Sequence, residues 1–238
     1  MKYLQKLISD EVINDVYDEV YIAYEELAKH YRRRAWTLVL KAFKKDCSFF
    51  ADVGSGPGQN SIYVASLNPK VRGVLIDLSQ SMIAKFVSIC PEDLKHRLYP
   101  VVGDMVYLPL RDSCLDSIIV IASLHHITSK ENRLQALKEF HRVLKEDGLM
   151  LVTVWSRWQY ELVKEAFKEV KQYLLRRKKS FWDVKRCSGS VCREYHLYTL
   201  GELVRDVKSA GFKILDRGVY TPAPGKKLSK NYFCLCSK

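Results

Sequence analysis

The sequence predicts an α/β fold in which helices cover both faces of a mostly parallel sheet. Short apolar runs alternate with amphipathic segments from Phe49 onward, a pattern produced by strands joined through right-handed crossover helices. A glycine-rich turn follows the first run, and an acidic residue stands at the end of each of the first three runs. Because ligands bind at the carboxyl ends of such strands, we expect a doubly wound, Rossmann-like sheet.

The glycine-rich turn lies in the stretch FFADVGSGPGQ, from Phe49 to Gln59. Gly54, Gly56 and Gly58 can take positive φ and let a ligand approach the backbone closely. A helix from Gln59 to about Ser66 would point its free amide groups at the turn, where they suit a carboxylate or a phosphate. An ordinary glycine turn is the alternative interpretation of this stretch alone.

The acids at the strand ends strengthen the prediction of a ligand site. Asp77 closes the run VRGVLID, 25 residues after Asp52, and Asp104 closes the run LYPVVGD. A carboxylate at the end of the second strand is where doubly wound folds bind ribose hydroxyls. The turn reads Asp-x-Gly-x-Gly-x-Gly and therefore differs from the dinucleotide pattern G-x-G-x-x-G.

The remaining elements follow from apolar periodicity and capping residues. The seven expected strands are Phe49–Val53, Val71–Ile76, Tyr99–Gly103, Ile118–Leu124, Leu149–Val154, Phe212–Tyr220 and Asn231–Cys236. The helices between them are expected at residues 59–66, 79–89, 131–144, 161–177 and 199–210, with Ser79 and Thr199 as N-caps. The short connection TPAPGKKLSK makes the last two strands an antiparallel hairpin, so the last strand is expected to run against the rest.

We expect one domain over residues 1–238, because no repeat or second core is visible. Residues 1–46 are expected to form a helical lid over the ligand cleft. Residues 178–194 are polar and basic, and we expect them to form a substrate loop.

Charge points to a polyanionic partner. The chain has 39 Lys and Arg against 27 Asp and Glu, a net charge of +12, and the excess gathers in runs such as Arg32–Arg34 and Arg176–Lys179. Nucleic acid is the first expectation and an anionic membrane the second, with a solvated basic surface as the alternative. No run of eighteen apolar residues and no signal peptide is visible, so no membrane location is expected.

The seven cysteines show no framework-like spacing. The close pairs Cys187/Cys192 and Cys234/Cys236 lack the C-x-x-C pattern, so we expect neither a zinc site nor any other metal site. A reducing compartment fits this usage, and we expect the cytoplasm, or else the nucleus.

Residues Cys47 to Trp155 resemble the S-adenosylmethionine-dependent methyltransferases of the Rossmann-like class I. The resemblance implies that the glycine turn holds the methionine end of the cofactor, Asp77 the ribose, and Asp104–Met105 the adenine. Another Rossmann-like binder is the alternative. The cofactor-binding residues expected from the turn, the strand ends and the resemblance are Asp52, Gly54, Ser55, Gly56, Gly58, Asp77, Leu78, Asp104, Met105 and Ser123.

Longer segments resemble a narrower family, the tRNA wobble-uridine carboxymethyl methyltransferases, which esterify 5-carboxymethyluridine. The similar segments are GDMVYLPLRDSCLDSIIVIASLHHI, a strand ending in Trp155, REYHLYTLGELV, NYF and VYDEVYIAYEELAKHYRRRAW. The chain departs from the family at Ser55–Gln59, where Cys-Gly-Asn-Gly-Lys is usual, and in a lid about three residues shorter. Because the lid is shorter, the arginine of the family can correspond to Arg32, Arg33 or Arg34. We favour Arg34, two residues before Trp36.

The resemblance implies the residues that act on the substrate. The catalytic residues are expected to be Arg34, His125, His126 and Arg193, and the substrate-binding residues Arg32, Arg33, Tyr195, His196, Tyr198 and Asn231. Chemistry agrees, because a carboxylate is already ionised at pH 7 and arginine holds it bidentately, so positioning replaces a strong base. Structural histidines, and a packed entry to the helix after REYHLY, are the alternatives.

The expected function is S-adenosylmethionine-dependent methyl esterification of 5-carboxymethyluridine at the tRNA wobble position, with the anticodon loop as partner. The family resemblance also implies a small zinc-binding activator subunit, bound along a sheet edge near the third strand to form a heterodimer. A methyltransferase for a small molecule or a quinone is the first alternative, and it needs less positive charge. A non-catalytic binding subunit is the second, although the complete set of acids and glycines argues against it.

Overall fold

The structure is a computed structural model, and it describes residues 34–158, 180, 182–188, 191–221 and 230–238. The predicted helix over residues 161–177, Arg32, Arg33 and most of the predicted lid lie outside the described residues. Within the described part of the chain, no helix is both long enough and apolar enough to span a membrane.

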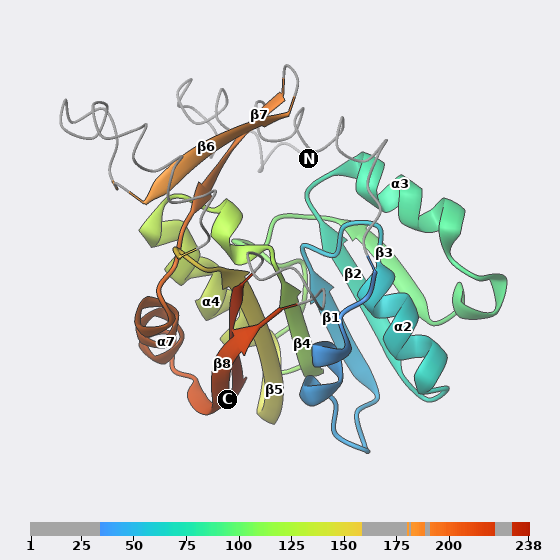
Figure 1. Ribbon diagram of the computed structural model, residues 1–238. Coiled ribbons are helices and arrows are strands. Elements are labelled where there is room, and N and C mark those ends of the chain that lie inside the picture. Colours follow the sequence, from blue (N-terminus) through green and yellow to red (C-terminus); the bar gives the residue numbers. More distant parts are fainter. Residues whose placement is uncertain (1–33, 159–179, 181, 189–190, 222–229) are drawn as a thin grey trace, which may run out of the picture.

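One sheet of seven strands forms the centre of the molecule, in the order β3-β2-β1-β4-β5-β9-β8 (Figure 1). Its strands are β1 (Phe49–Val53), β2 (Arg72–Asp77), β3 (Leu98–Val102), β4 (Leu115–Ile121), β5 (Leu144–Trp155), β8 (Lys213–Tyr220) and β9 (Asn231–Ser237). Neighbours from β3 to β5 are parallel, whereas β9 runs antiparallel to both β5 and β8. The predicted fold class is therefore confirmed, including the antiparallel last strand.

The described helices are η1 (Thr37–Ala42), α2 (Gln59–Leu67), α3 (Gln80–Ile89), η2 (Glu92–Leu94), η3 (Leu124–His126), α4 (Lys130–Val143) and α7 (Leu200–Ser209). Among them, α3, α4 and α7 begin at a side-chain cap. Ser79 accepts a hydrogen bond from the Met82 amide and Thr199 accepts one from the Glu202 amide, so both predicted N-caps are confirmed.

Two apolar layers hold the helices against the sheet. One layer joins α4 and α7 to one face and includes Phe140 and Val207, both fully buried. The other joins η1, α2 and α3 to the opposite face and includes Val39, Val64 and Phe86. Figure 1 shows α2 and α3 on one side of the sheet and α4 and α7 on the other, so helices cover both faces as predicted.

The predicted N-terminal helix is corrected in its described part. Residues Thr37–Ala42 form a short 3-10 helix, and the chain is extended on both sides of it, at Trp36 and Phe43. Trp36 anchors this segment, because its amide donates to Asn60 Oδ1 at 3.0 Å and its ring lies 5.3 Å from that of Tyr220. These contacts hold the segment against α2 and β8, so a long helix is not required there.

The loop conformation predicted for residues 178–194 is wrong in its described part. Strands β6 (Asp183–Ser188) and β7 (Val191–His196) pair there as an antiparallel hairpin, which Figure 1 shows apart from the main sheet. The sequence of this hairpin resembles that of a loop because few of its residues are apolar. Val184 and Tyr195 are buried, whereas Lys185 and Arg186 are exposed.

A disulfide joins Cys187 to Cys192 in this hairpin. The two residues are directly opposite each other in the register of β6 and β7, and they are the second pair from the turn. The spacing of the cysteines did not lead us to expect this bond. The bond fixes the pairing of the two strands next to the turn.

Candidate cofactor and substrate site

The glycine turn follows β1 and packs against the end of β4. Gly54 has φ +68°, and its amide donates to the Ile76 carbonyl at 2.7 Å. A Cβ at this position would lie 2.4 Å from Ser123 Oγ, and Ser123 Oγ in turn donates to the Gly54 carbonyl at 2.9 Å. Only glycine fits between the turn and Ser123, so the turn packs directly on the end of β4.

Asp77 connects this turn to the end of β2. One carboxylate oxygen accepts from the Gly56 amide at 2.7 Å, and the other accepts from the Ser79 amide at 3.0 Å. The side chain remains half-buried, as does that of Leu78 beside it. The predicted ribose-binding acid and the predicted turn are therefore held together, with the acid partly open to a ligand.

Asp52 lies inside the protein. Its side chain is 1% exposed and accepts from Ser61 Oγ at 2.8 Å, which joins β1 to α2. Burial raises the pKa of Asp52 to about 7, against the opposing effect of the Ser61 hydrogen bond. We had predicted this acid to bind the cofactor, and its contacts instead secure the helix that follows the turn.

Asp104 and Met105 lie at the end of β3. Asp104 Oδ1 accepts from the Val106 amide at 2.9 Å, which fixes the turn, and both residues are half-buried. A Cβ on Gly54 would lie 3.4 Å from Met105 Cε, so Met105 borders the glycine turn. The ends of β1, β3 and β4 therefore meet around Gly54, where the sequence predicts the cofactor.

Replacing Asp77 with alanine should weaken S-adenosylmethionine binding by roughly 1.5–3 kcal/mol, since a hydrogen bond to a charged group is lost. Isothermal titration calorimetry measures this. Asp93→Ala removes an exposed carboxylate of the same kind and should leave the affinity unchanged. Equal affinities in the two variants would contradict the placement of the ribose at Asp77.

Next to the turn, four ring side chains form an aromatic cluster of His125, His126, Trp155 and Tyr195. The rings of His125 and Trp155 stack at 4.7 Å, those of Trp155 and Tyr195 at 4.7 Å, and those of His126 and Tyr195 lie 4.7 Å apart. The cluster joins η3, the end of β5 and the hairpin strand β7. Three of its members were predicted as site residues. Trp155 was noted only as the end of a strand, and its position at a strand's carboxyl end was the signal that we did not use.

Two arginines lie over this cluster. The guanidinium carbon of Arg193 is 5.7 Å from the Tyr195 ring, and that of Arg186 is 5.7 Å from the Trp155 ring. Arg186 and Arg193 are also directly opposite each other across the hairpin. Like charges in opposed positions repel, so an anion placed between them would be stabilised. Arg193 was predicted as catalytic, whereas Arg186 was predicted only as part of a basic run.

His196 and Tyr198 do not face this site, which corrects their predicted roles in substrate binding. His196 is 4% exposed and is held between carboxylates, with Nδ1 2.6 Å from Asp183 Oδ1 and Nε2 2.7 Å from Glu202 Oε1. Burial alone would lower the pKa of His196, but these hydrogen bonds outweigh burial and raise it. Tyr198 is fully buried, with the Arg133 guanidinium over its ring at 5.4 Å.

This His196 network secures the hairpin to the main domain. Glu202 Oε2 also accepts from Arg157 at 2.9 Å, and Arg133 lies 4.0 Å from Glu202 Oε1. The network therefore joins β6, β7, α4 and α7 with the residues after β5. It thereby anchors β7, the strand that carries Arg193 and Tyr195.

Two further predicted site residues are Asn231, predicted to bind substrate, and Arg34, predicted to be catalytic. Asn231 is 2% exposed at the start of β9, opposite Trp155 in the register of β5 and β9. Arg34 is exposed on the segment that leads into Trp36.

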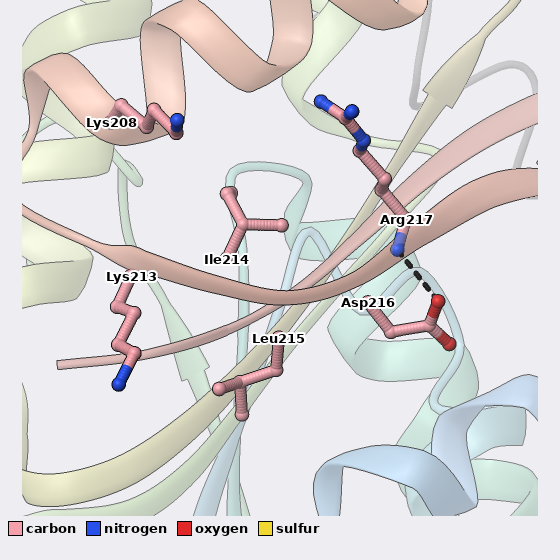
Figure 2. Close-up of a pocket in the computed structure, with 6 residues that line it drawn as sticks. All are labelled: Lys208, Lys213, Ile214, Leu215, Asp216 and Arg217. Atoms are coloured by element: carbon pink, nitrogen blue, oxygen red, sulfur yellow. Dashed lines mark hydrogen bonds between the residues drawn. The ribbon is translucent and has the colours of Figure 1, made fainter.

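A depression of about 510 Å³ lies elsewhere, beside the edge strand β8 (Figure 2). It is lined by Lys208, Lys213, Ile214, Leu215, Asp216 and Arg217. The lining residues of β8 that pair with β9 lie opposite Cys234–Ser237, which in turn pair with Leu149–Val152 of β5. The depression is therefore separate from the strand ends that carry the predicted site.

Comparison with known proteins agrees with this geometry. Residues 51–152 match the family model of a methyltransferase domain. A candidate methyltransferase of Encephalitozoon cuniculi is 32% identical over 119 residues, which cover 49% of this chain and 53% of that protein. The Mus musculus tRNA (carboxymethyluridine(34)-5-O)-methyltransferase ALKBH8 is 28% identical over 176 residues, which cover 72% of this chain and 24% of that protein. The chain thus spans about half of one relative and a quarter of the other.

Solved structures show the same fold. A SAM-dependent methyltransferase from Methanosarcina mazei superposes with a TM-score of 0.73 at 18% identity, covering 87% of this chain and 99% of its own. A chain from the complex between the Haloferax volcanii Trm112 methyltransferase activator and a methyltransferase gives 0.66 at 16% identity, covering 93% of this chain and 96% of its own. The protein therefore has the class I methyltransferase fold and takes S-adenosylmethionine as its cofactor, and residues 51–152 are similar to a methyltransferase domain.

Proposed function

We propose that this chain is a tRNA methyltransferase that esterifies the carboxylate of 5-carboxymethyluridine at the wobble position, giving 5-methoxycarbonylmethyluridine. The observation that carries the proposal is the pairing of Arg186 with Arg193 over the aromatic cluster, beside the glycine turn. A carboxylate fits between two guanidinium groups, and a flat base fits against aromatic rings. The mouse relative is named as a methyltransferase of carboxymethyluridine in tRNA.

The residues of the glycine turn fit the cofactor, because Gly54 and Asp77 are both half-buried at neighbouring strand ends, where its methionine and ribose ends would be held. When bound, S-adenosylmethionine supplies an electrophilic methyl group on a sulfonium.

The protein's own task is to bring one carboxylate oxygen in line with that methyl group. Arg193, with Arg186 or Arg34, would hold the carboxylate, and His126 or His125 would donate a further hydrogen bond. The carboxylate oxygen would accept the methyl group and leave the cofactor as a neutral thioether, so these residues would not have to remove a proton from the nucleophile. Positioning of this kind contributes about 7–11 kcal/mol to lowering a barrier, so a strong general base is unnecessary.

We also propose a small zinc-binding activator protein as a partner, bound along β3, and a cytoplasmic or nuclear location. Strand β3 is an edge of the sheet, and Tyr99 and Val102 on it are 42% and 51% exposed. An exposed edge strand favours pairing with another chain. The structural neighbour from Haloferax volcanii was solved with the Trm112 activator.

The function is tested with tRNA that contains 5-carboxymethyluridine and with cofactor that carries a labelled methyl group. We expect label in the wobble nucleoside as an ester, which mild alkali releases and mass spectrometry of the nucleosides identifies. The rate should be flat from about pH 6 to pH 8, because a carboxylate with a pKa near 4 stays ionised throughout. Alkali-stable label in RNA, or label only in a small molecule, would refute the proposal. The first outcome would indicate a different RNA atom, and the second a small-molecule or quinone methyltransferase.

A further inference from the structure

Trp158 is an exposed aromatic residue close to the proposed reaction centre. It follows β5 by three residues, and 62% of its surface is exposed. Its amide donates to Ser156 Oγ at 3.1 Å, which orders the backbone that presents it. A large aromatic side chain left in water near a binding site indicates a surface that is covered when a ligand is present.

Trp182, at the entrance to the hairpin, supports Trp158. The two rings meet edge to face, with 6.0 Å between centroids and 67° between planes. The guanidinium carbon of Arg157 lies 4.2 Å from the Trp182 ring centroid, a close cation–π contact. The three side chains therefore form a single unit, which we call the Trp158–Trp182 platform.

Arg157 is itself fixed. Its guanidinium donates to Glu202 at 2.9 Å and to the Leu197 carbonyl at 3.2 Å, and its amide donates to the Tyr198 carbonyl at 2.7 Å. The His196 network thus holds the platform as well as the hairpin. Because these groups are ordered before a ligand arrives, stacking on the platform costs little conformational entropy.

The platform is continuous with the aromatic cluster. Trp155 and Trp182 both pack against the small core under the hairpin, formed by Val184, Tyr195 and Leu197. Exposed Lys185 and Arg186 are on the same hairpin and add positive charge. A flat aromatic surface beside exposed cations fits a nucleobase with its phosphates, since every base offers a π-face and the backbone is anionic.

We propose that the Trp158–Trp182 platform stacks an unpaired nucleobase next to the nucleotide that receives the methyl group. The ligand is thus a single-stranded loop of RNA, and this inference rests on the proposed RNA function. Trp158 supplies the stacking face, and Trp182 and Arg157 hold it.

The test measures binding of a fluorescent anticodon stem-loop RNA by anisotropy, and it does not require methyl transfer. Trp158→Ala should raise the dissociation constant roughly 5- to 150-fold, the range for losing one stacked base. Trp158→Phe keeps an aromatic face and should retain most of the affinity. Leu215→Ala removes another exposed apolar side chain, on β8, and should bind as the original chain does. Equal melting temperatures show that the variants are folded.

The stacked base is found with RNAs in which one loop position at a time is abasic. At the position that stacks, the original chain should lose affinity to the level of Trp158→Ala, and Trp158→Ala should lose nothing further. Additive losses at every position, an unchanged constant in Trp158→Ala, or no RNA binding by the original chain would overturn the platform. An ester product together with unchanged binding by Trp158→Ala would support the proposed function and refute the platform. Binding that depends on Trp158, without an ester product, would support the platform and refute the proposed function.

Discussion

Arg193→Ala should lower the rate of methyl esterification by about thirty- to a thousandfold. The loss of one bidentate, charge-assisted contact in a site that excludes water costs about 2–4 kcal/mol of transition-state stabilisation. Cofactor affinity should not change, because the glycine turn and Asp77 lie on other elements. Single-turnover methylation of tRNA together with calorimetry measures both quantities.

Two matched variants separate anchoring of the carboxylate from general electrostatics. Arg193→Lys keeps the charge but not the planar fork, and it should recover only part of the rate. Lys185→Ala removes a neighbouring exposed charge on β6 and should reduce RNA affinity while leaving the single-turnover rate nearly intact. If Arg193→Ala reacted at the original rate at saturating RNA, Arg193 would not hold the carboxylate. A rate that rose steeply through a pKa near 6.5 and vanished in His126→Ala would instead identify a histidine base.

Glu202→Ala should be among the most destabilising single changes, lowering the free energy of unfolding by about 3–5 kcal/mol. Glu202 accepts from His196 at 2.7 Å and from Arg157 at 2.9 Å, and its side chain is only 18% exposed. Removing the carboxylate leaves the Arg157 guanidinium and the His196 ring nitrogen without this acceptor. Chemical denaturation measures the loss, which should be accompanied by a fall in methylation because Arg193 and Tyr195 lose their support.

Controls for this prediction come from the same chain. Glu202→Gln keeps the shape and a hydrogen-bond acceptor but not the charge, so it should be intermediate. Glu92 pairs with Lys95 on the surface, where its side chain is 87% exposed, and Glu92→Ala should leave stability unchanged. A Glu202→Ala protein as stable as the Glu92→Ala protein would mean that the His196 network does not secure the hairpin.

The parallel part of the sheet could be predicted from the sequence because its signals are local. An apolar run followed by an acid and a cap, as at Asp77 and Ser79, specifies a strand end and a helix start within a few residues. The predicted strand Ile118–Leu124 was three residues too far along the chain, because β4 spans Leu115–Ile121 and the buried Ala122 and Leu124 belong to the turn into η3. Apolar character there reflects burial and not strand geometry.

The hairpin and the His196 network could not be predicted in this way. Among the described residues of β6 and β7, Val184 and Tyr195 are buried apolar side chains, but the buried Asp183 and His196 are polar, so composition hides the strand period. The role of His196 depends on Asp183 and Glu202, which reach it from different elements, and residue type alone does not reveal such burial. The contact of Trp158 with Trp182 could not be predicted either, because Trp182 lies 24 residues further along the chain.

The position of β9 has a consequence for the order in which the protein is made. Strand β9 fills the place between β5 and β8, yet it begins 76 residues after β5 ends, at Asn231 compared with Trp155. While the ribosome synthesises that stretch, β5 remains an open edge and β8 has no strand to join. Trp155 can therefore reach its final setting only late in translation. A chaperone that shields apolar edges on the nascent chain would then act at β5, and a pause in synthesis before Asn231 would prolong its exposure.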